Sequence, residues 1–262
     1  MAKKDKEVTI TSDENVPVAF DMEQDAEGGH EGADSDSYAI PFLSILQKGS
    51  PQVDEDKGEF IPEAKAGMFF NTVTQQLYNG ETGVVIIPCA FSRVFIEWGI
   101  DQGGFKGIYS PSDPIINTAV RDETGKFMLP GNQSFLADTR QHFVLIFHEQ
   151  RFDQIVISLS STQLKKSRNW MSQMRSMKIP GKSGPYTPPT FSHMYLATTI
   201  PEANEKGSWR GWKIALDRVL DPSIQLDVIL YQAAKKFRQL IVEGKAQVSP
   251  PVADGVDDDT PF

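Results

Sequence analysis

The sequence predicts a mainly β fold with added helices. Short apolar segments with the two-residue alternation of strands recur through the middle of the chain and are separated by Gly, Pro, Asn and Asp. Only two longer segments, near residues 162–178 and 221–243, have the spacing of amphipathic helices. The sequence contains no internal repeat, so we expect one α+β body and not an array of similar units.

Length and composition are typical of a globular protein. The 262 residues are 39% hydrophobic and 23% charged, which supports a packed core. No apolar run approaches the ~18 residues that cross a bilayer, and residues 1–11 lack the apolar stretch of a signal peptide, so we expect a cytoplasmic protein with no membrane partner. Cys89 is the single cysteine, which excludes an internal disulfide. The four histidines are scattered along the chain, so we expect no metal site, and we expect no other cofactor.

Charge divides the chain into three parts. Residues 1–37 carry a net charge of −8 and residues 246–262 carry −4, whereas residues 38–245 carry +3. Neither end has enough apolar side chains to form a core, so we expect a disordered acidic arm at 1–37 and a disordered acidic tail at 246–262. The sequence therefore predicts one folded, mildly basic domain between two acidic ends.

Strands are expected wherever apolar residues alternate or form a short β-prone run. They lie at residues 84–87, 92–98, 142–148, 155–159, 190–199 and 208–216. Tyr78-Asn-Gly80 is a turn signal that closes a hairpin before the first of these strands, and residues 150–153 close another. Residues 99–133 are rich in Gly, Pro, Asp and Ser, which predicts a long functional or mobile loop.

Two helices complete the predicted body. The first runs from Thr162, as its cap, to about Lys178, and a Gly/Pro loop at 180–189 follows it. The second begins at Asp221-Pro222, with Asp as the cap and Pro in the first turn, and ends at Gly244. Its apolar stripe is formed by Leu226, Ile229, Leu230, Ala233, Phe237, Leu240 and Ile241.

A stretch without acidic residues indicates a surface that meets an anion. Between Gln154 and Pro201 there is no Asp or Glu, although the whole protein is acidic. The stretch contains six bases, which are Lys165, Lys166, Arg168, Arg175, Lys178 and Lys182.

The last six residues carry the most specific motif. Asp257-Asp258-Asp259-Thr260-Pro261-Phe262 resembles the C-terminus of bacterial single-stranded DNA-binding proteins, Asp-Asp-Asp-Ile-Pro-Phe, at every position except Thr260. In that family the tip docks replication and repair proteins: the ring and the terminal carboxylate enter an apolar pocket rimmed by bases, while the aspartates steer the encounter. The resemblance implies that the partner-docking residues here are Asp257, Asp258, Asp259, Pro261 and Phe262.

The chain as a whole resembles the single-stranded DNA-binding proteins of tailed bacteriophages. Bacterial members place the binding domain near the N-terminus, whereas this chain begins with an acidic arm and has a longer body. The phage proteins join a divergent OB-fold to an acidic tail with an aromatic end. This resemblance implies an OB-like Greek-key barrel at 38–245 and non-catalytic, sequence-tolerant protection of single-stranded DNA in phage replication, recombination or repair. It places the protein in the host cell cytoplasm.

Single-strand binding requires aromatic faces for the bases and Lys or Arg for the phosphates. Three segments of the body interleave these residue types. The expected DNA-binding residues are Arg93, Phe95, Trp98, Lys106 and Tyr109 in the first, Lys165, Lys166, Arg168, Trp170, Arg175, Lys178, Lys182 and Tyr186 in the second, and Trp209, Arg210, Trp212 and Lys213 in the third.

Several of these aromatic residues are also candidates for the core. Phe95 and Trp98 fall on opposite faces of one strand, as do Trp209 and Trp212, so at most one ring of each pair is expected to face DNA. Trp170 shares one arc of its helix with methionines, which favours the core over the DNA surface.

Two other classes of function remain open. A metal-dependent nuclease would need converging carboxylates, for which Glu97 with Asp101, or Glu149 with Asp153, are candidates. EDTA-sensitive cleavage of DNA would decide for this class. A phage structural or host-interaction protein would use its acidic ends for protein contacts only, and would fail to bind DNA even at low salt. No Walker A, Gly-x-Ser-x-Gly or His-Glu-x-x-His motif occurs, which argues against ATP hydrolysis and the common hydrolases.

Overall fold

The computed structural model describes residues 28–33, 39–100, 104–131, 133–148, 151–205, 207–245 and 248. Within these residues the chain forms eleven strands in two antiparallel sheets, two α-helices and three short 3-10 helices, which confirms the predicted mainly β fold with added helices. Most of the predicted N-terminal arm (1–37) and nearly all of the predicted tail (246–262) lie outside the described residues. No helix in the described part of the chain is long and apolar enough to span a membrane.

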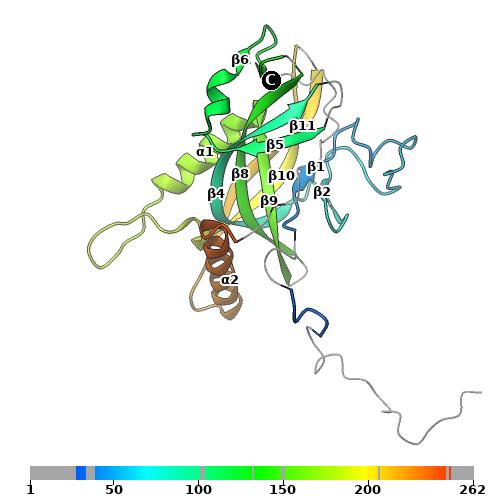
Figure 1. The fold of residues 1–262 in the computed structure, drawn as a ribbon. Coiled ribbons are helices and arrows are strands. Elements are labelled where there is room, and N and C mark those ends of the chain that lie inside the picture. Colours follow the sequence, from blue (N-terminus) through cyan, green and yellow to red (C-terminus); the bar gives the residue numbers. More distant parts are fainter. Residues whose placement is uncertain are drawn as a thin grey trace, which may run out of the picture.

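Two long strands form the spine of the larger sheet. β4 (Val84–Gly99) and β8 (Ser134–His148) pair along nearly their whole length. The other strands of this sheet are β5 (Phe105–Tyr109), β6 (Val120–Arg121), β7 (Phe127–Met128), β9 (Arg151–Ser160), β10 (His193–Asn204) and β11 (Gly207–Val219). β10 and β5 pair with the two ends of β4, and β9 and β7 with the two ends of β8. The sheet curls into a half-barrel (Figure 1).

The two strands predicted at 84–87 and 92–98 are the halves of β4. Pro88 interrupts the sequence pattern, but in the structure it lies at a bulge in the pairing with β8. A proline cannot donate to a strand ladder, so it is tolerated at a bulge or at an edge without a partner. Both conditions hold here, because β10 pairs only with residues 84–86 of β4 and β5 only with residues 95–98.

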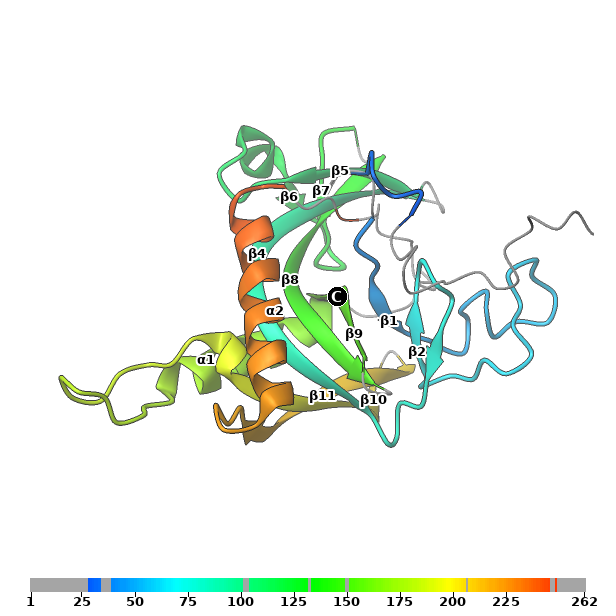
Figure 2. The ribbon, with the colours of Figure 1, turned by 90° about the horizontal axis from the view of Figure 1, so that it is seen from below.

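A small sheet lies across the open side of the half-barrel (Figure 2). It consists of β1 (Leu43–Ile45), β2 (Phe69–Asn71) and β3 (Leu77–Tyr78). The carbonyl of Pro41, just before β1, accepts a hydrogen bond from the Val156 N–H at the edge of β9 over 2.8 Å. The side chain of Gln47, just after β1, bonds to the backbone of Arg210 on β11. The segment around β1 therefore joins the two edges of the larger sheet.

The turn predicted at Tyr78-Asn-Gly80 forms, but the hairpin does not. The Asn79 side-chain oxygen accepts hydrogen bonds from the N–H groups of Glu81 and Thr82. β3 then pairs with β2 and not with β4, because the turn carries the chain from the small sheet to the larger one. Gly80 is required at this crossing, since a Cβ there would lie 1.8 Å from the Gly67 carbonyl oxygen.

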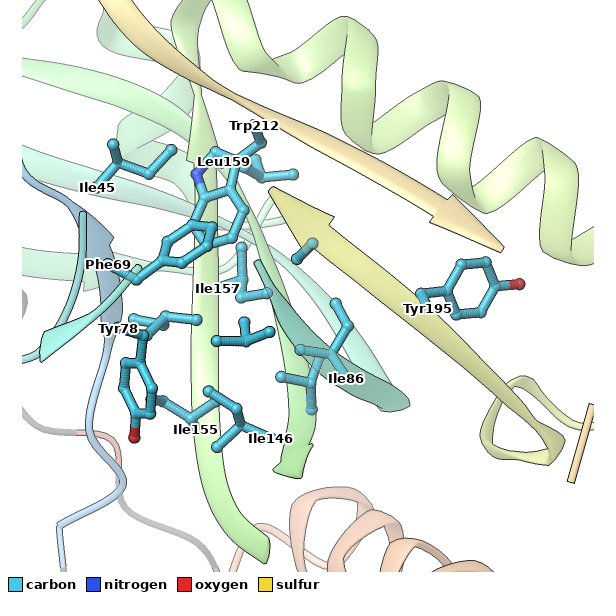
Figure 3. Packing of buried hydrophobic residues seen from close by; sticks show 14 of the residues in the cluster. Ile45, Phe69, Tyr78, Ile86, Ile146, Ile155, Ile157, Leu159, Tyr195 and Trp212 are labelled. Carbon is cyan, nitrogen blue, oxygen red and sulfur yellow. The ribbon is translucent and has the colours of Figure 1, made fainter. Parts of the chain in front are cut away.

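The core has two main layers, one on each face of the larger sheet. The concave face packs against the small sheet and α1 (Leu164–Ser176), with Phe69 stacked on Trp212 at 4.8 Å between ring centroids (Figure 3). The convex face packs against α2 (Gln225–Val242), which crosses it on the outside (Figure 2). Each spine strand alternates its side chains between these layers, as strand geometry requires.

The predicted loop at 99–133 contains several short elements. Besides β5, β6 and β7 it contains the 3-10 helix η2 (Pro114–Thr118). Ile115 and Ile116 of η2 pack against a third apolar cluster that includes Phe95, Leu129 and Leu136. The sequence pattern does not predict these elements, because each is only two to five residues long. The predicted hairpin of β8 with β9 is confirmed. The strands predicted at 190–199 and 208–216 also form, as β10 and β11, and they pair with each other.

Both predicted helix caps are wrong. Thr162 lies in the 3-10 helix η3 (Ser161–Gln163), and α1 begins only at Leu164. Asp221 accepts a hydrogen bond from the Ser223 N–H in a turn, and α2 begins at Gln225. The predicted end of α2 at Gly244 is confirmed, with Gly244 in the left-handed region at φ 67°.

The buried row of α2 is displaced from the predicted stripe. The residues that face the sheet are Asp227, Leu230, Ala234 and Phe237, with Ile241 half-buried. Leu226 and Ile229, both members of the predicted stripe, are 39% and 47% exposed. The displacement arises because the carboxylate of Asp227 takes the first inward position, where it pairs with Arg218 on β11.

Candidate nucleic-acid interface

Two arginines face each other across the spine of the larger sheet. Arg93 on β4 and Arg140 on β8 are direct cross-strand neighbours. Like charges in this position destabilise a strand pair, and the carboxylate of Asp138 offsets the repulsion. It accepts hydrogen bonds from Arg93 Nε and Nη2 at 3.1 and 2.9 Å, and Arg140 Nη1 lies 3.0 Å from its Oδ1.

α1 brings a third arginine to the same place. The Trp170 ring stacks on His142 at 4.6 Å between centroids, and Ser167 Oγ lies 2.8 Å from His142 Nε2, so the helix is fixed over β8. Arg168 follows Ser167 and is exposed. Burial lowers the pKa of Arg140, and although Asp138 opposes this effect, the charges of Arg93 and Arg168 lower the pKa further. We call Arg93, Asp138, Arg140 and Arg168 the arginine cluster.

An exposed ring and an apolar hollow adjoin the arginine cluster. Phe91 lies on the same face of β4 as Arg93, is 41% exposed, and meets the His142 ring edge-on at 5.1 Å. The hollow beside it is small and is lined by Pro88, Ala90, Phe91, His142, Met171, Met174 and Thr190. Burial, together with the charge of Arg140, lowers the pKa of His142 to about 3, so this ring is neutral at physiological pH.

The exposed side of α1 extends the positive surface. Lys165, Arg168 and Arg175 are all exposed and recur at the i, i+3 and i+10 positions of one helix side. We call these three residues the basic stripe. Lys166 faces elsewhere, because its ammonium group pairs with Glu202 on β10 at 2.7 Å.

Glu202 holds the first turn of α1 against the edge of the sheet. Its carboxylate accepts hydrogen bonds from Gln163 Nε2 at 3.0 Å and from Trp209 Nε1 at 3.1 Å, besides the ion pair with Lys166. Burial tends to raise the pKa of Glu202, but these three donors outweigh it and hold the pKa below its ordinary value. The carboxylate lies directly over Gly211, where a Cβ would be 1.8 Å from Glu202 Oε2.

The sequence matches the family model of the Pam3 phage gp34-like proteins over residues 5–247. The chain belongs to this family. Comparisons with curated proteins and with solved structures found no match. The family associates this gp34-like chain with bacteriophages, in agreement with the resemblance found in the sequence. The expected partner-docking residues Asp257, Asp258, Asp259, Pro261 and Phe262 lie beyond both the matched segment and the described residues.

Three aromatic residues proposed for DNA binding lie in the core of the gp34-like chain. Phe95 packs with Leu129 and Leu136, Trp170 points from α1 into the core, and Trp212 packs on the small sheet. Their rings are buried and are not available to stack on bases. This agrees with the expectation that one ring in each of the pairs on β4 and β11 would face inward, and with the core placement favoured for Trp170.

The rest of the first predicted segment is divided between two faces of β4. Tyr109 on β5 lies on the Arg93 face, where its hydroxyl donates to Glu97 Oε2 over 2.7 Å. Trp98 lies on the opposite face, half-buried and edge-on to Phe105 at 6.2 Å between ring centroids. Lys106 is exposed on the edge strand β5. Arg93 is therefore the single member of this segment in the arginine cluster.

The remaining predicted residues lie on the loop after α1 and on β11. The loop projects away from the barrel (Figures 1 and 2) and presents Lys178, Lys182 and Tyr186 on its exposed surface. Tyr186 and Ile179 exchange backbone hydrogen bonds at 3.0 Å, which closes the loop as a short ladder. On β11, Lys213 is exposed and Arg210 is half-buried. Of the predicted DNA-binding residues, the structure thus brings Arg93 together with the basic stripe of α1, which is formed by Lys165, Arg168 and Arg175.

The arginine cluster, the basic stripe and Phe91 together form the candidate interface. Three of its residues, Phe91, Asp138 and Arg140, are not among those predicted from the sequence. The alternation Phe91-x-Arg93, which begins one residue before the strand predicted at 92–98, is a visible signal for the first of them, because two side chains two residues apart on a strand share a face. Asp138 and Arg140 lie between the predicted loop and the next predicted strand, and only the register of β4 with β8 places them opposite Arg93.

The acids considered for a nuclease have structural partners or lie outside the described residues. Glu97 accepts hydrogen bonds from Tyr109 and Ser134, and Asp153 pairs with His148 at 3.0 Å. Asp101 and Glu149 are outside the described part of the chain. Within that part, no group of three or more His, Cys, Asp or Glu side chains is placed to hold a metal ion.

Proposed function

We propose that this gp34-like protein binds single-stranded DNA without sequence preference. It would protect exposed strands during phage replication, recombination or repair, and the C-terminal tail would recruit partner proteins. The observation that carries the proposal is the exposed Phe91 ring beside Arg93 and Arg168 on one face of the molecule. An aromatic face next to guanidinium groups is the combination that single-strand binding requires.

The chemistry of this face favours tolerance of base sequence. Guanidinium groups pair with phosphate oxygens, which carry no sequence information. The hollow is lined mainly by apolar and methionine side chains, which adapt to different shapes and offer few groups that could read a base edge. We therefore propose binding through phosphates and stacking, with each stacked base contributing ~1–3 kcal/mol.

The same face favours single strands over duplex. In a duplex the faces of the bases are covered by their neighbours in the stack, so none is free to lie on Phe91. The proposal includes no catalytic step, because the described carboxylates near this face serve as partners of Arg93, Arg140, Tyr109 and Ser134.

Fluorescence anisotropy with labelled oligo-dT and with a duplex of equal length tests this function. We expect oligo-dT to bind more tightly than the duplex, and Phe91→Ala to weaken oligo-dT binding about tenfold, as expected for the removal of one stack. The matched control is Phe152→Ala, since Phe152 is an exposed ring on β9, 36% exposed, outside the interface. Circular dichroism of both variants establishes that they fold.

Two results would count against the proposal. Tighter binding to duplex than to oligo-dT would exclude a single-strand protein. Equal weakening in Phe91→Ala and Phe152→Ala would place the stacking surface elsewhere. The nuclease alternative is tested in the same samples, where cleavage of labelled DNA that EDTA abolishes would support an enzyme.

A further inference from the structure

The arginine cluster carries more positive charge than one internal phosphate of DNA can balance. Arg93, Arg140 and Arg168 each carry one positive charge, and Asp138 is the carboxylate that pairs with two of them. A net charge of about +2 therefore lies in one place, because Arg168 follows Ser167, whose hydroxyl contacts His142, and His142 and Arg140 share one face of β8. An internal phosphodiester carries one negative charge, whereas a phosphomonoester carries about −1.5 to −2 at neutral pH and offers three acceptor oxygens.

The arginine cluster also has hydrogen-bond donors that Asp138 does not use. A guanidinium has five N–H donors, and the pair with Asp138 uses only the Nε and Nη2 groups of Arg93. The Arg93 side chain is 44% exposed, so a ligand can reach it. Arg168 is exposed, and none of the described carboxylates lies within ion-pair distance of it.

Neighbouring elements bound the cluster on both sides along the spine strands. On one side His142 is covered by Ser167 and Trp170 of α1. On the other side Phe95 and Leu136 are covered by η2 and the segment after it. The arginines therefore lie between these two covered regions of the spine strands, and the basic stripe extends from Arg168 along α1.

From this arrangement we infer that the arginine cluster binds the terminal phosphate of a DNA strand. The ligand is a phosphomonoester at a strand end, and the internal phosphodiesters next to it lie along the basic stripe. This inference rests on the proposed function and adds to it a preference for one kind of strand end. Protection of strands would then begin at phosphorylated ends.

Three oligonucleotides that differ only at their ends test the inference. We would compare an oligo-dT of about 10 nucleotides, within the site size of one OB-fold, with a 5′-phosphate, with a 3′-phosphate, or with hydroxyl groups at both ends. The label is placed on an internal base. We expect one phosphorylated form to bind about tenfold more tightly than the hydroxyl form, the gain of one additional charge-assisted hydrogen bond. Inorganic phosphate should compete more strongly with this form than with the hydroxyl form.

Variants assign the preference to the cluster. Arg168→Ala should remove most of the preference for the phosphorylated end, whereas the matched control Arg238→Ala, an exposed arginine on α2, should retain it. Asp138→Asn keeps the shape of the side chain and removes the competing negative charge, so it should increase the preference. A preference that survives in Arg168→Ala and in Arg93→Ala would place the end-binding site outside the cluster.

The ionisation of the ligand supplies an independent readout. The second pKa of a phosphomonoester is about 6, so the preference should shrink as the pH falls from about 7.5 to about 5. The charged groups that face this place are Arg93, Asp138, Arg140 and Arg168, and the neighbouring His142 stays neutral over this range because burial lowers its pKa to about 3. The hydroxyl-ended oligonucleotide reports any change in the protein itself.

The outcomes separate this inference from the proposed function. Equal affinity for all three oligonucleotides, with oligo-dT still preferred over duplex, overturns end recognition and leaves single-strand binding intact. Absence of oligo-dT binding at low salt overturns both.

Discussion

The side-chain amide of Gln47 pairs with the backbone of Arg210 in both directions. Gln47 Oε1 accepts from the Arg210 N–H over 2.8 Å, and Gln47 Nε2 donates to the Arg210 carbonyl over 3.0 Å. An amide side chain thus takes the place of one residue of a neighbouring strand at the edge of β11. The edge is protected from further strand pairing at this point, and the small sheet is fixed to the larger one.

Replacement of Gln47 should therefore destabilise the half-barrel and the small sheet that lies across it. We expect Gln47→Ala to lower the free energy of unfolding by about 1–3 kcal/mol, because both backbone groups of Arg210 lose a partner in a half-buried place. Urea denaturation followed by tryptophan fluorescence measures the change. Gln232→Ala, at an exposed position on α2, is the control and should change stability by less than about 0.5 kcal/mol. Equal stability of the two variants would show that the small sheet does not depend on this pair.

Gly211 should tolerate a methyl group only when Glu202 is removed. The Cβ of Gly211→Ala would lie 1.8 Å from Glu202 Oε2, so the carboxylate must leave its three donors. We expect a decrease of about 1–2 kcal/mol in the free energy of unfolding, measured by urea denaturation. In a Glu202→Ala background the same substitution should cost much less, because the group it displaces is absent.

A second glycine serves as the control for this cycle. A Cβ on Gly58 would have no atom within 4 Å, so Gly58→Ala should have little effect in either background. If Gly211→Ala costs the same with and without Glu202, the strain at this position comes from the strand backbone and not from the carboxylate.

Much of the fold follows from local sequence patterns, and the interface does not. The hairpin of β8 with β9 is predictable because alternation and turn residues lie close together in the sequence. The arginine cluster combines β4, β8 and α1, so it depends on a strand register and on the packing of Trp170 against His142. Neither the strand register nor the contact of Trp170 with His142 can be read from the local sequence pattern.

The errors at the helix starts have a common cause. Thr162 and Asp221 are residue types that favour caps, yet in the structure both belong to turns that precede the helix. The buried position of Asp227 was also unpredictable, because an acidic residue enters a core row only when a partner such as Arg218 is present, and that partner comes from another element.

The Arg218–Asp227 pair should make the free energy of unfolding depend on pH. The hydrogen bonds from Arg218 lower the pKa of Asp227 below its ordinary value of 3.8. A lowered pKa means that the pair stabilises the fold above this ordinary value, and that the contribution is lost as the pH falls through the lower, folded-state pKa. Asp227→Asn should therefore cost about 1.5–3 kcal/mol at neutral pH, as expected when a buried carboxylate loses its charge-assisted hydrogen bonds, and much less at about pH 2. Urea denaturation at both pH values measures this, with the exposed Asp56→Asn as the control.

The basic stripe on α1 should contribute to the salt dependence of DNA binding. Replacing Lys165, Arg168 and Arg175 together by Ala should weaken oligo-dT binding. It should also flatten the plot of the logarithm of affinity against the logarithm of salt concentration. The slope should fall by ~0.7 for each phosphate contact that is lost. The matched control replaces Lys235, Lys236 and Arg238, three exposed bases on α2, by Ala. An unchanged slope in a folded stripe variant, or an equal change in the control, would show that DNA passes over another surface.

The acidic tail is expected to compete with DNA for the positive surface. Deleting residues 254–262 removes four aspartates and the Pro261-Phe262 tip. If the tail competes for the interface, the truncated protein should bind oligo-dT more tightly than the full chain at low salt. The gain should shrink as salt rises, because charges are screened over a Debye length of ~8 Å at physiological ionic strength. Equal affinity of the two proteins at low salt would exclude this competition.

Phe262→Ala distinguishes competition for DNA from partner docking within the same tail. The substitution leaves all four aspartates in place, so DNA affinity should barely change at any salt concentration. Docking should be abolished, because a buried aromatic anchor dominates a small interface and the aspartates alone only steer the encounter. A pull-down from host lysate with wild-type, Phe262→Ala and Thr260→Ala baits measures this, and Thr260→Ala should behave as wild type because position 260 already differs from the bacterial motif. If the Phe262→Ala bait retains the same proteins as the wild type, the ring is not an anchor and the tail acts through its charge alone.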